Sequence, residues 1–158
     1  MMDDLRRLVP LVALLMFAAI GCGDGEDVTR ARAEDGIWEI EPGAEPATTP
    51  SGLVIFHVAE GKGDEPKDGN TVAVHYTGMF EDGTVFDSSY PRGGPLQFVL
   101  GRGSVIAGWE EGIALMQPGG RARLIIPPEL AYGSAGAGNG FIPPDATLTF
   151  DVWLVTVQ

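Results

Sequence analysis

Residues 104–120 read S-V-I-A-G-W-E-E-G-I-A-L-M-Q-P-G-G and carry the clearest helical pattern in the chain. Ser104 is a suitable N-cap, and Pro118-Gly119-Gly120 would end the helix. A helix of about 11 residues is only marginally stable alone, so we expect a sheet to pack on it. Spacings of three and four place its large apolar residues on one face: Ile106, Trp109, Ile113 and Met116.

Two glycines and a tryptophan determine how a sheet could meet this helix. Gly108 and Gly112 are poor helix formers, but they lack side chains and would let a sheet approach closely. Trp109 is the largest apolar side chain on the buried face. The pattern leaves two interpretations open: Trp109 is ordinary core, or it is the floor of a pocket that the sheet does not fully cover.

The other apolar segments predict strands. The most regular is Thr147 to Val157, in which Leu148, Phe150, Val152 and Leu154 share one face. Asp82-Gly83 is a hairpin signal. We therefore predict an α+β domain over residues 51–158, an antiparallel sheet covered by one helix. Its shorter strand-like segments lie at 53–59, 71–80, 84–86, 96–100 and 121–126.

The chain is acidic. Its 158 residues include 10 Lys and Arg against 22 Asp and Glu, a formal net charge of −12. This balance argues against a nucleic-acid partner, which requires clustered positive charge.

The first residues predict export. Arg6-Arg7 precede an apolar run from Leu8 to Ile20, which is typical of a signal peptide over residues 1–21. The run of about 13 residues is shorter than the roughly 20 that a transmembrane helix needs.

Cys22 directly follows this segment and is the only cysteine, so no disulfide can form within the chain. A signal that ends at a lone cysteine resembles the bacterial lipoprotein signal, which implies a lipidated Cys22 that anchors the protein to a membrane. The alternative is ordinary secretion with a free cysteine. The lipoprotein resemblance implies the periplasmic face of a bacterial membrane, and Gly23 rather than Asp after the cysteine favours the outer membrane.

Residues 22–50 are rich in Asp, Glu, Gly, Ala, Thr and Pro and predict a flexible acidic tether. Ile37-Trp38-Glu39-Ile40 interrupts it. This short apolar segment is either an edge strand that docks on the domain or a patch that binds a partner, and we favour docking.

The usual catalytic signatures are missing. His57 and His75 are the only histidines, and each sits in an apolar strand without a second ligand at metal-binding spacing, so we interpret both as structural. The glycine-rich residues 136–140 are not followed by the Lys-Ser/Thr of a phosphate-binding loop. We expect no metal and no cofactor.

Several motifs nevertheless occur together and in order. Residues 74–78 read V-H-Y-T-G, 81–89 read E-D-G-T-V-F-D-S-S and 105–112 read V-I-A-G-W-E-E-G. Shorter motifs follow: A-Y-G at 131–133, I-P-P at 142–144 and L-T-F-D-V at 148–152. From about Ser51 to Val157 the chain thus resembles the FKBP-type peptidyl-prolyl cis–trans isomerases. The resemblance implies a twisted antiparallel sheet wrapped around one short helix, with Trp109 as a pocket floor.

The resemblance also implies the site residues. Asp87 either orients its neighbours or caps a turn with Ser88-Ser89. Three features depart from the family pattern, and the resemblance places all of them on the pocket rim. Leu96 stands where an aromatic residue is common, Ser104 stands where some members carry an acid, and the loop 133–140 is one residue longer, with Phe141 before Ile142. The implied catalytic residues are Tyr76, Phe86, Asp87, Trp109, Tyr132 and Phe150. The implied substrate-binding residues are Arg92, Leu96, Phe98, Val105, Ile106, Phe141 and Ile142.

The activity implied by this resemblance is rotation about X–Pro bonds in exported proteins, inside an apolar aromatic pocket. The implied partners are proline-containing polypeptides and rapamycin-like macrolides. Two alternatives stay open: a module of the same fold that binds proline segments without catalysis, and a structural lipoprotein whose acidic tail recruits a partner.

Overall fold

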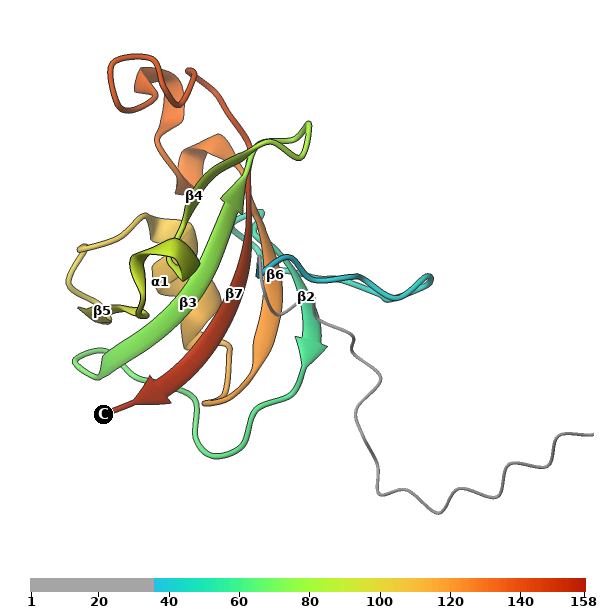
Figure 1. The fold of residues 1–158 in the computed structure, drawn as a ribbon, viewed down its shortest axis with the longest axis vertical. Coiled ribbons are helices and arrows are strands. Elements are labelled where there is room, and N and C mark those ends of the chain that lie inside the picture. The colour runs from blue at the N-terminus through green and yellow to red at the C-terminus, as the bar shows by residue number, and fades with distance from the viewer. Residues whose placement is uncertain (1–35) are drawn as a thin grey trace, which may run out of the picture.

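The computed structural model describes residues 36–158, which form one antiparallel sheet with one α-helix against it (Figure 1). The sheet order is β1-β2-β6-β7-β3-β4, and β5 also pairs with β3. The helix α1 spans Ala107–Ala114, and no helix of residues 36–158 is long and apolar enough to cross a membrane. The strands are β1 Ala47–Thr48, β2 Val54–Ala59, β3 Thr71–Met79, β4 Val85–Ser88, β5 Leu96–Val99, β6 Arg121–Ile126 and β7 Leu148–Val157.

The predicted α+β architecture is confirmed. Each predicted strand forms within one to two residues of its expected ends, and Gly83 takes a φ of 83° in the turn between β3 and β4. The two longest strands, β3 and β7, lie side by side at the centre, with Gly78 opposite Phe150 and Tyr76 opposite Val152. The strands twist across the helix, as Figure 1 shows.

The face of the sheet toward α1 forms the core. Leu148, Phe150, Val152 and Leu154 of β7 are buried there, as their alternation predicts. The two helix glycines permit the close approach that we expected. A Cβ on Gly108 would lie 2.4 Å from Cγ2 of Ile126, and one on Gly112 would lie 2.7 Å from Cδ1 of Leu124.

The helix is shorter than predicted. Its N-cap is Ile106, which is extended (φ −62°, ψ 151°), and no side chain caps it, so the prediction of Ser104 as the cap is wrong. At the other end Leu115 leaves the helix (φ −98°, ψ 8°), and Met116 reaches the core from beyond the last turn. The apolar spacing predicted correctly which residues are buried, but not where the backbone stops being helical.

Trp38 covers part of the opposite face of the sheet. Asp151 of β7 is fully buried there and accepts two hydrogen bonds of 2.6 Å from Arg123. Trp38 is buried too: its backbone N–H donates to Asp151 Oδ2 (2.6 Å), and its backbone carbonyl accepts from Arg123 Nη2 (2.7 Å). Residues 37–40 therefore dock, but they lie across the face of β6 and β7 rather than extending the sheet. The strand at this edge is β1, which pairs with β2.

Candidate functional site

The helix start, four strands and two loops surround an open pocket of about 170 Å³. Its floor comes from α1 and the central strands. Its rim comes from β5, from the loop before α1 and from the loop that holds Tyr132. The lining residues are Tyr76, Phe86, Asp87, Leu96, Ser104, Val105, Ile106, Trp109, Tyr132 and Phe150.

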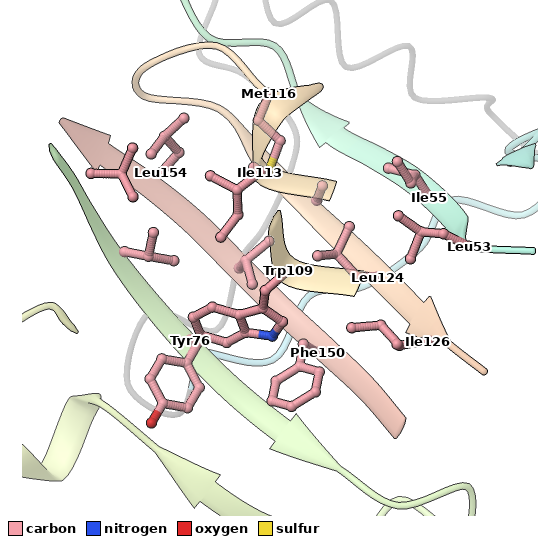
Figure 2. Packing of buried hydrophobic residues seen from close by; sticks show 14 of the residues in the cluster. Leu53, Ile55, Tyr76, Trp109, Ile113, Met116, Leu124, Ile126, Phe150 and Leu154 are labelled. Carbon is pink, nitrogen blue, oxygen red and sulfur yellow. The ribbon is translucent and has the colours of Figure 1, made fainter. Parts of the chain in front are cut away.

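Trp109 is both core and pocket floor. Its exposed fraction is 4%, yet its ring lines the open pocket. Tyr76 and Phe150 meet the indole edge-on, with ring centroids 4.9 and 5.3 Å away (Figure 2). Edge-to-face contacts of this kind hold aromatic rings in fixed orientations. The indole Nε1 is buried and finds no hydrogen-bond acceptor among residues 36–158.

Gly78 allows the second wall of the pocket to form. A Cβ at this position would lie 2.8 Å from both the Phe150 and the Phe86 rings. Without it, the Phe86 ring packs edge-on against Phe150 at 5.5 Å. A glycine near the C-terminal end of β3 thus lets the ring from β4 pack against the ring from β7.

One polar network borders these rings. The Tyr76 hydroxyl donates to Asp87 Oδ2 (2.6 Å) and accepts from Arg92 Nη1 (3.0 Å). Arg92 also forms an ion pair with Asp87 Oδ1. Burial, helped by the hydrogen bond and the negative charge of Asp87, raises the pKa of Tyr76 to about 12. The phenol therefore stays protonated at neutral pH and keeps its bond to the carboxylate.

Asp87 contacts both its own strand and Tyr76. Its Oδ1 accepts the N–H of Ser88 (2.9 Å), the next residue of β4, and its Oδ2 accepts the Tyr76 hydroxyl (2.6 Å). The carboxylate also lines the pocket edge.

A carboxylate that the sequence analysis did not place in the site holds the loop before α1, which forms part of the pocket rim. Glu110 accepts the backbone N–H groups of Gly101 (2.6 Å) and Gly103 (2.9 Å). These bonds fix the loop that leads into Val105 and Ile106. Both glycines take a positive φ, 76° and 65°, where the loop turns sharply. Their presence in the sequence was the available signal for this turn.

The mouth of the pocket is open to solvent. Tyr132 is 40% exposed and Leu96 38% exposed, and Ser104 completes the rim between them. The sequence analysis wrongly assigned Ser104 to the helix cap, but its departure from the family pattern also placed it on the rim, where it lies.

Four residues predicted for the site do not line this pocket. Phe98 lies beside Trp109 in the core, with ring centroids 6.1 Å apart, and Ile142 is also buried in the core. The Arg92 side chain is 59% exposed and acts on the pocket only through Tyr76 and Asp87. Phe141 is 61% exposed and borders a different hollow.

Neither histidine lies in the site. His57 is exposed on β2, whereas His75 stacks between Tyr90 and Trp153 with its Nδ1 3.0 Å from Ser89 Oγ. The glycine-rich loop is closed by a backbone bridge between Ala137 and Ile142.

Comparison with known proteins agrees with this geometry. The peptidyl-prolyl cis-trans isomerase Fkbp12 of Drosophila melanogaster is 51% identical over 108 residues, which is 68% of this chain and 99% of that protein. The FK506-binding protein of Streptomyces anulatus is 51% identical over 117 residues, 73% of this chain and 92% of that protein. The crystal structure of FkpA from Escherichia coli superposes with a TM-score of 0.68 and 48% identity, and covers 75% of this chain and 53% of that one.

The family comparison gives the same answer over most of the described chain. Residues 62–155 match the family described as FKBP-type peptidyl-prolyl cis-trans isomerase. This match, the relatives and the ring-lined pocket lead to one conclusion: the chain belongs to the FKBP-type peptidyl-prolyl cis–trans isomerases and has their isomerase activity.

Proposed function

We propose that isomerisation takes place in the pocket over Trp109, with the proline ring of the substrate against the indole. The observation that carries this proposal is an indole that is only 4% exposed and still forms part of an open pocket. Phe86, Phe150 and Tyr76 would contact the sides of the proline ring.

The chemistry follows from the amide bond. Rotation about it loses resonance and has a barrier of about 18–20 kcal/mol. In the twisted state, the carbonyl and the nitrogen carry less separated charge than in the planar state. Water stabilises the planar, more polar state better, so a pocket lined by aromatic rings favours the twisted one. Only this difference in binding between the two states accelerates the reaction.

Two groups at the mouth would position the substrate. Tyr132 is 40% exposed and lines the pocket, and its hydroxyl can donate a hydrogen bond to a substrate carbonyl. The backbone N–H of Ile106 precedes the first turn of α1 and has no backbone acceptor among residues 36–158, so it is available as a second donor. Neither role requires a proton transfer.

A rate assay tests the site. We expect Trp109→Leu and Phe86→Leu to lower kcat/KM on a Leu-Pro tetrapeptide by about tenfold or more, or roughly 1.4 kcal/mol of transition-state stabilisation. Leu115→Ala is the control, because Leu115 is 41% exposed and lies outside the pocket. Circular dichroism would show whether each variant folds. Unchanged rates in both folded pocket variants would mean that the reaction occurs elsewhere.

We also propose that the same pocket binds rapamycin-like macrolides, because relatives named FK506-binding proteins are 51% identical to this chain. Leu96 replaces a common aromatic residue on the rim, which would alter affinity rather than abolish binding. Titration with FK506 during the isomerase assay tests this. If the protein bound the macrolide but did not accelerate isomerisation, it would be a binding module only.

The cellular setting is a further proposal: an exported protein, lipidated at Cys22, that assists proline isomerisation in other exported proteins. Its support is the basic start, the apolar run and the cysteine in residues 1–22, which lie outside the described residues. Metabolic labelling with a fatty acid, for the natural chain and for Cys22→Ser, tests the anchor. Label that depends on Cys22 supports it, and label absent from both chains rejects it.

A further inference from the structure

A second hollow, of about 440 Å³, lies beside the proposed catalytic pocket. It opens between the tip of the β3–β4 hairpin and the loop before β7, which Figure 1 shows at the same end of the sheet. Its walls are apolar, formed by Phe80, Phe141, Pro143 and Ala146, and its rim carries the carboxylates of Glu81 and Asp82. The mechanism above does not use any of these residues.

The two hollows share one aromatic wall. Phe86 lines the catalytic pocket, and its ring centroid lies 4.9 Å from that of Phe80, which lines the second hollow. The Phe80 ring is in turn 6.5 Å from Phe141 on the far side. Because extended chain advances roughly 3.3–3.6 Å per residue, about three residues would cover these two steps. The second hollow thus lies within the reach of a substrate segment of about three residues.

Phe141 is held in an exposed position by the backbone around it. Its exposed fraction of 61% is the highest among the large apolar side chains of residues 36–158. It lies in a tight turn closed by two 3.0 Å hydrogen bonds between Ala137 and Ile142, and its own N–H donates to Gly138 (3.2 Å). The side chain cannot reach the core while this turn is closed, so its apolar surface is available to a ligand.

The charge of the rim indicates the kind of ligand. Asp82 is committed to the hairpin, where its Oδ1 accepts the N–H of Thr84 (2.8 Å), and Glu81 is exposed beside it. The hollow thus offers apolar walls and an acidic edge in a chain with a formal net charge of −12. A complementary segment has a large apolar side chain next to Lys or Arg.

We propose that this hollow is a substrate subsite that selects a large apolar residue flanked by a basic one, about three residues from the proline that is isomerised. Phe141 and Phe80 contact the apolar side chain, and Glu81 faces the basic one. The proposal rests on the proposed function, because its occupant is the substrate of the catalytic pocket.

The test compares peptides with a single Leu-Pro bond. One carries Phe-Lys about three residues after the proline, a second carries Lys-Phe about three residues before it, and each has a reference peptide with Ser-Ser at the same positions. NMR exchange between the cis and trans proline signals gives kcat/KM for each without a coupling protease. The measured quantity is the ratio of kcat/KM between a test peptide and its reference.

We expect a ratio of about ten for one of the two directions, the size of discrimination that one apolar side chain in a pocket typically gives. Phe141→Ser should reduce this ratio to about one. Glu81→Gln should reduce the ratio about twofold for these peptides. The same variant should not change the ratio for a further peptide in which Gln replaces the Lys. Leu115→Ser is the matched control, because it makes the same kind of exposed apolar-to-Ser change away from the hollow and should keep the ratio.

The ratio cancels general effects of a variant on folding or on the catalytic pocket. A ratio of about one in the natural protein for both directions, or a high ratio that survives Phe141→Ser, overturns the subsite while leaving the isomerase activity in place. No catalysed exchange in any peptide overturns the proposed function and the subsite together.

Discussion

The hydroxyl of Tyr76 links the electrostatics of the site to the stability of the folded protein. Its pKa is raised to about 12, mainly by burial, from the ordinary value of 10.0. Between these two values the unfolded chain has lost the proton that the folded one keeps. The folded state therefore binds more protons, and the free energy of unfolding falls as pH rises from about 10 to about 12. We expect a loss on the order of 2 kcal/mol across this window.

Denaturant unfolding at a series of pH values measures this loss, and Tyr76→Phe provides the control. The variant lacks the phenol, so its stability should fall less over the same window. Subtracting one curve from the other removes the contribution of lysines and other tyrosines. Parallel curves would show that burial of Tyr76 does not disfavour its phenolate.

Tyr132 gives a second prediction at the scale of one atom. If its exposed hydroxyl donates to a substrate carbonyl, Tyr132→Phe loses one neutral hydrogen bond and keeps the ring. A bond worth about 0.5–1.5 kcal/mol corresponds to a roughly two- to tenfold lower kcat/KM. The tetrapeptide assay measures it, with thermal unfolding as the check on the fold. An unchanged rate would assign Tyr132 to the rim alone.

Individual residues also show what a sequence can predict about a site. The motifs predicted Tyr76, Phe86, Trp109 and Phe150, and all four line the pocket. The family pattern also predicted Phe98, which instead packs beside Trp109 in the core, a matter of three-dimensional packing that no spacing encodes.

At the scale of elements, the two helix glycines carry the contact between α1 and β6. Alanine normally favours a helix by about 1 kcal/mol over glycine. Here an added Cβ would meet Ile126 at 2.4 Å or Leu124 at 2.7 Å, inside a packed core. We expect Gly108→Ala and Gly112→Ala to destabilise the protein by about 1–3 kcal/mol in spite of the better propensity.

Chemical denaturation measures this effect, and Gly94→Ala is the matched control. A Cβ at Gly94 would find nothing within 4 Å, so that variant should stay within about 0.5 kcal/mol of the natural protein. Stabilisation by either helix variant would show that helix propensity outweighs the close approach.

The ends of α1 mark the limit of element prediction. Apolar periodicity continues from Ile106 to Met116, but regular helix covers only Ala107–Ala114. Side chains before and after the helix reach the pocket or the core from non-helical backbone. The pattern of burial therefore extends beyond both ends of the helix. The Glu110 carboxylate, which binds the loop before the helix, adds a constraint that periodicity does not contain.

At the scale of the whole molecule, residues 36–50 are part of the folded body. The acidic composition of residues 22–50 predicts a tether, yet residues 36–50 include Trp38, which is 3% exposed, and β1, which extends the sheet. Composition averages over a segment, and a single tryptophan has little weight in it. The partners of Trp38 are more than 80 residues away in sequence, so the sequence could suggest docking but not the face on which it occurs.

This docking predicts that residues 36–50 stabilise the isomerase domain. The Trp38 ring is buried and lies 5.2 Å from the guanidinium carbon of Arg121, which also faces Trp153. Trp38→Ala keeps the backbone hydrogen bond to Asp151 but loses the buried ring, so it should lower the free energy of unfolding by about 2–4 kcal/mol. A fragment of residues 51–158 should lose at least as much relative to residues 36–158, because it lacks β1 as well. The control is Glu39→Ala, whose side chain is exposed. Equal stability of the two fragments in urea would show that residues 36–50 contact the sheet without stabilising it. A loss of stability with unchanged kcat/KM would show that this face of the sheet does not contribute to catalysis.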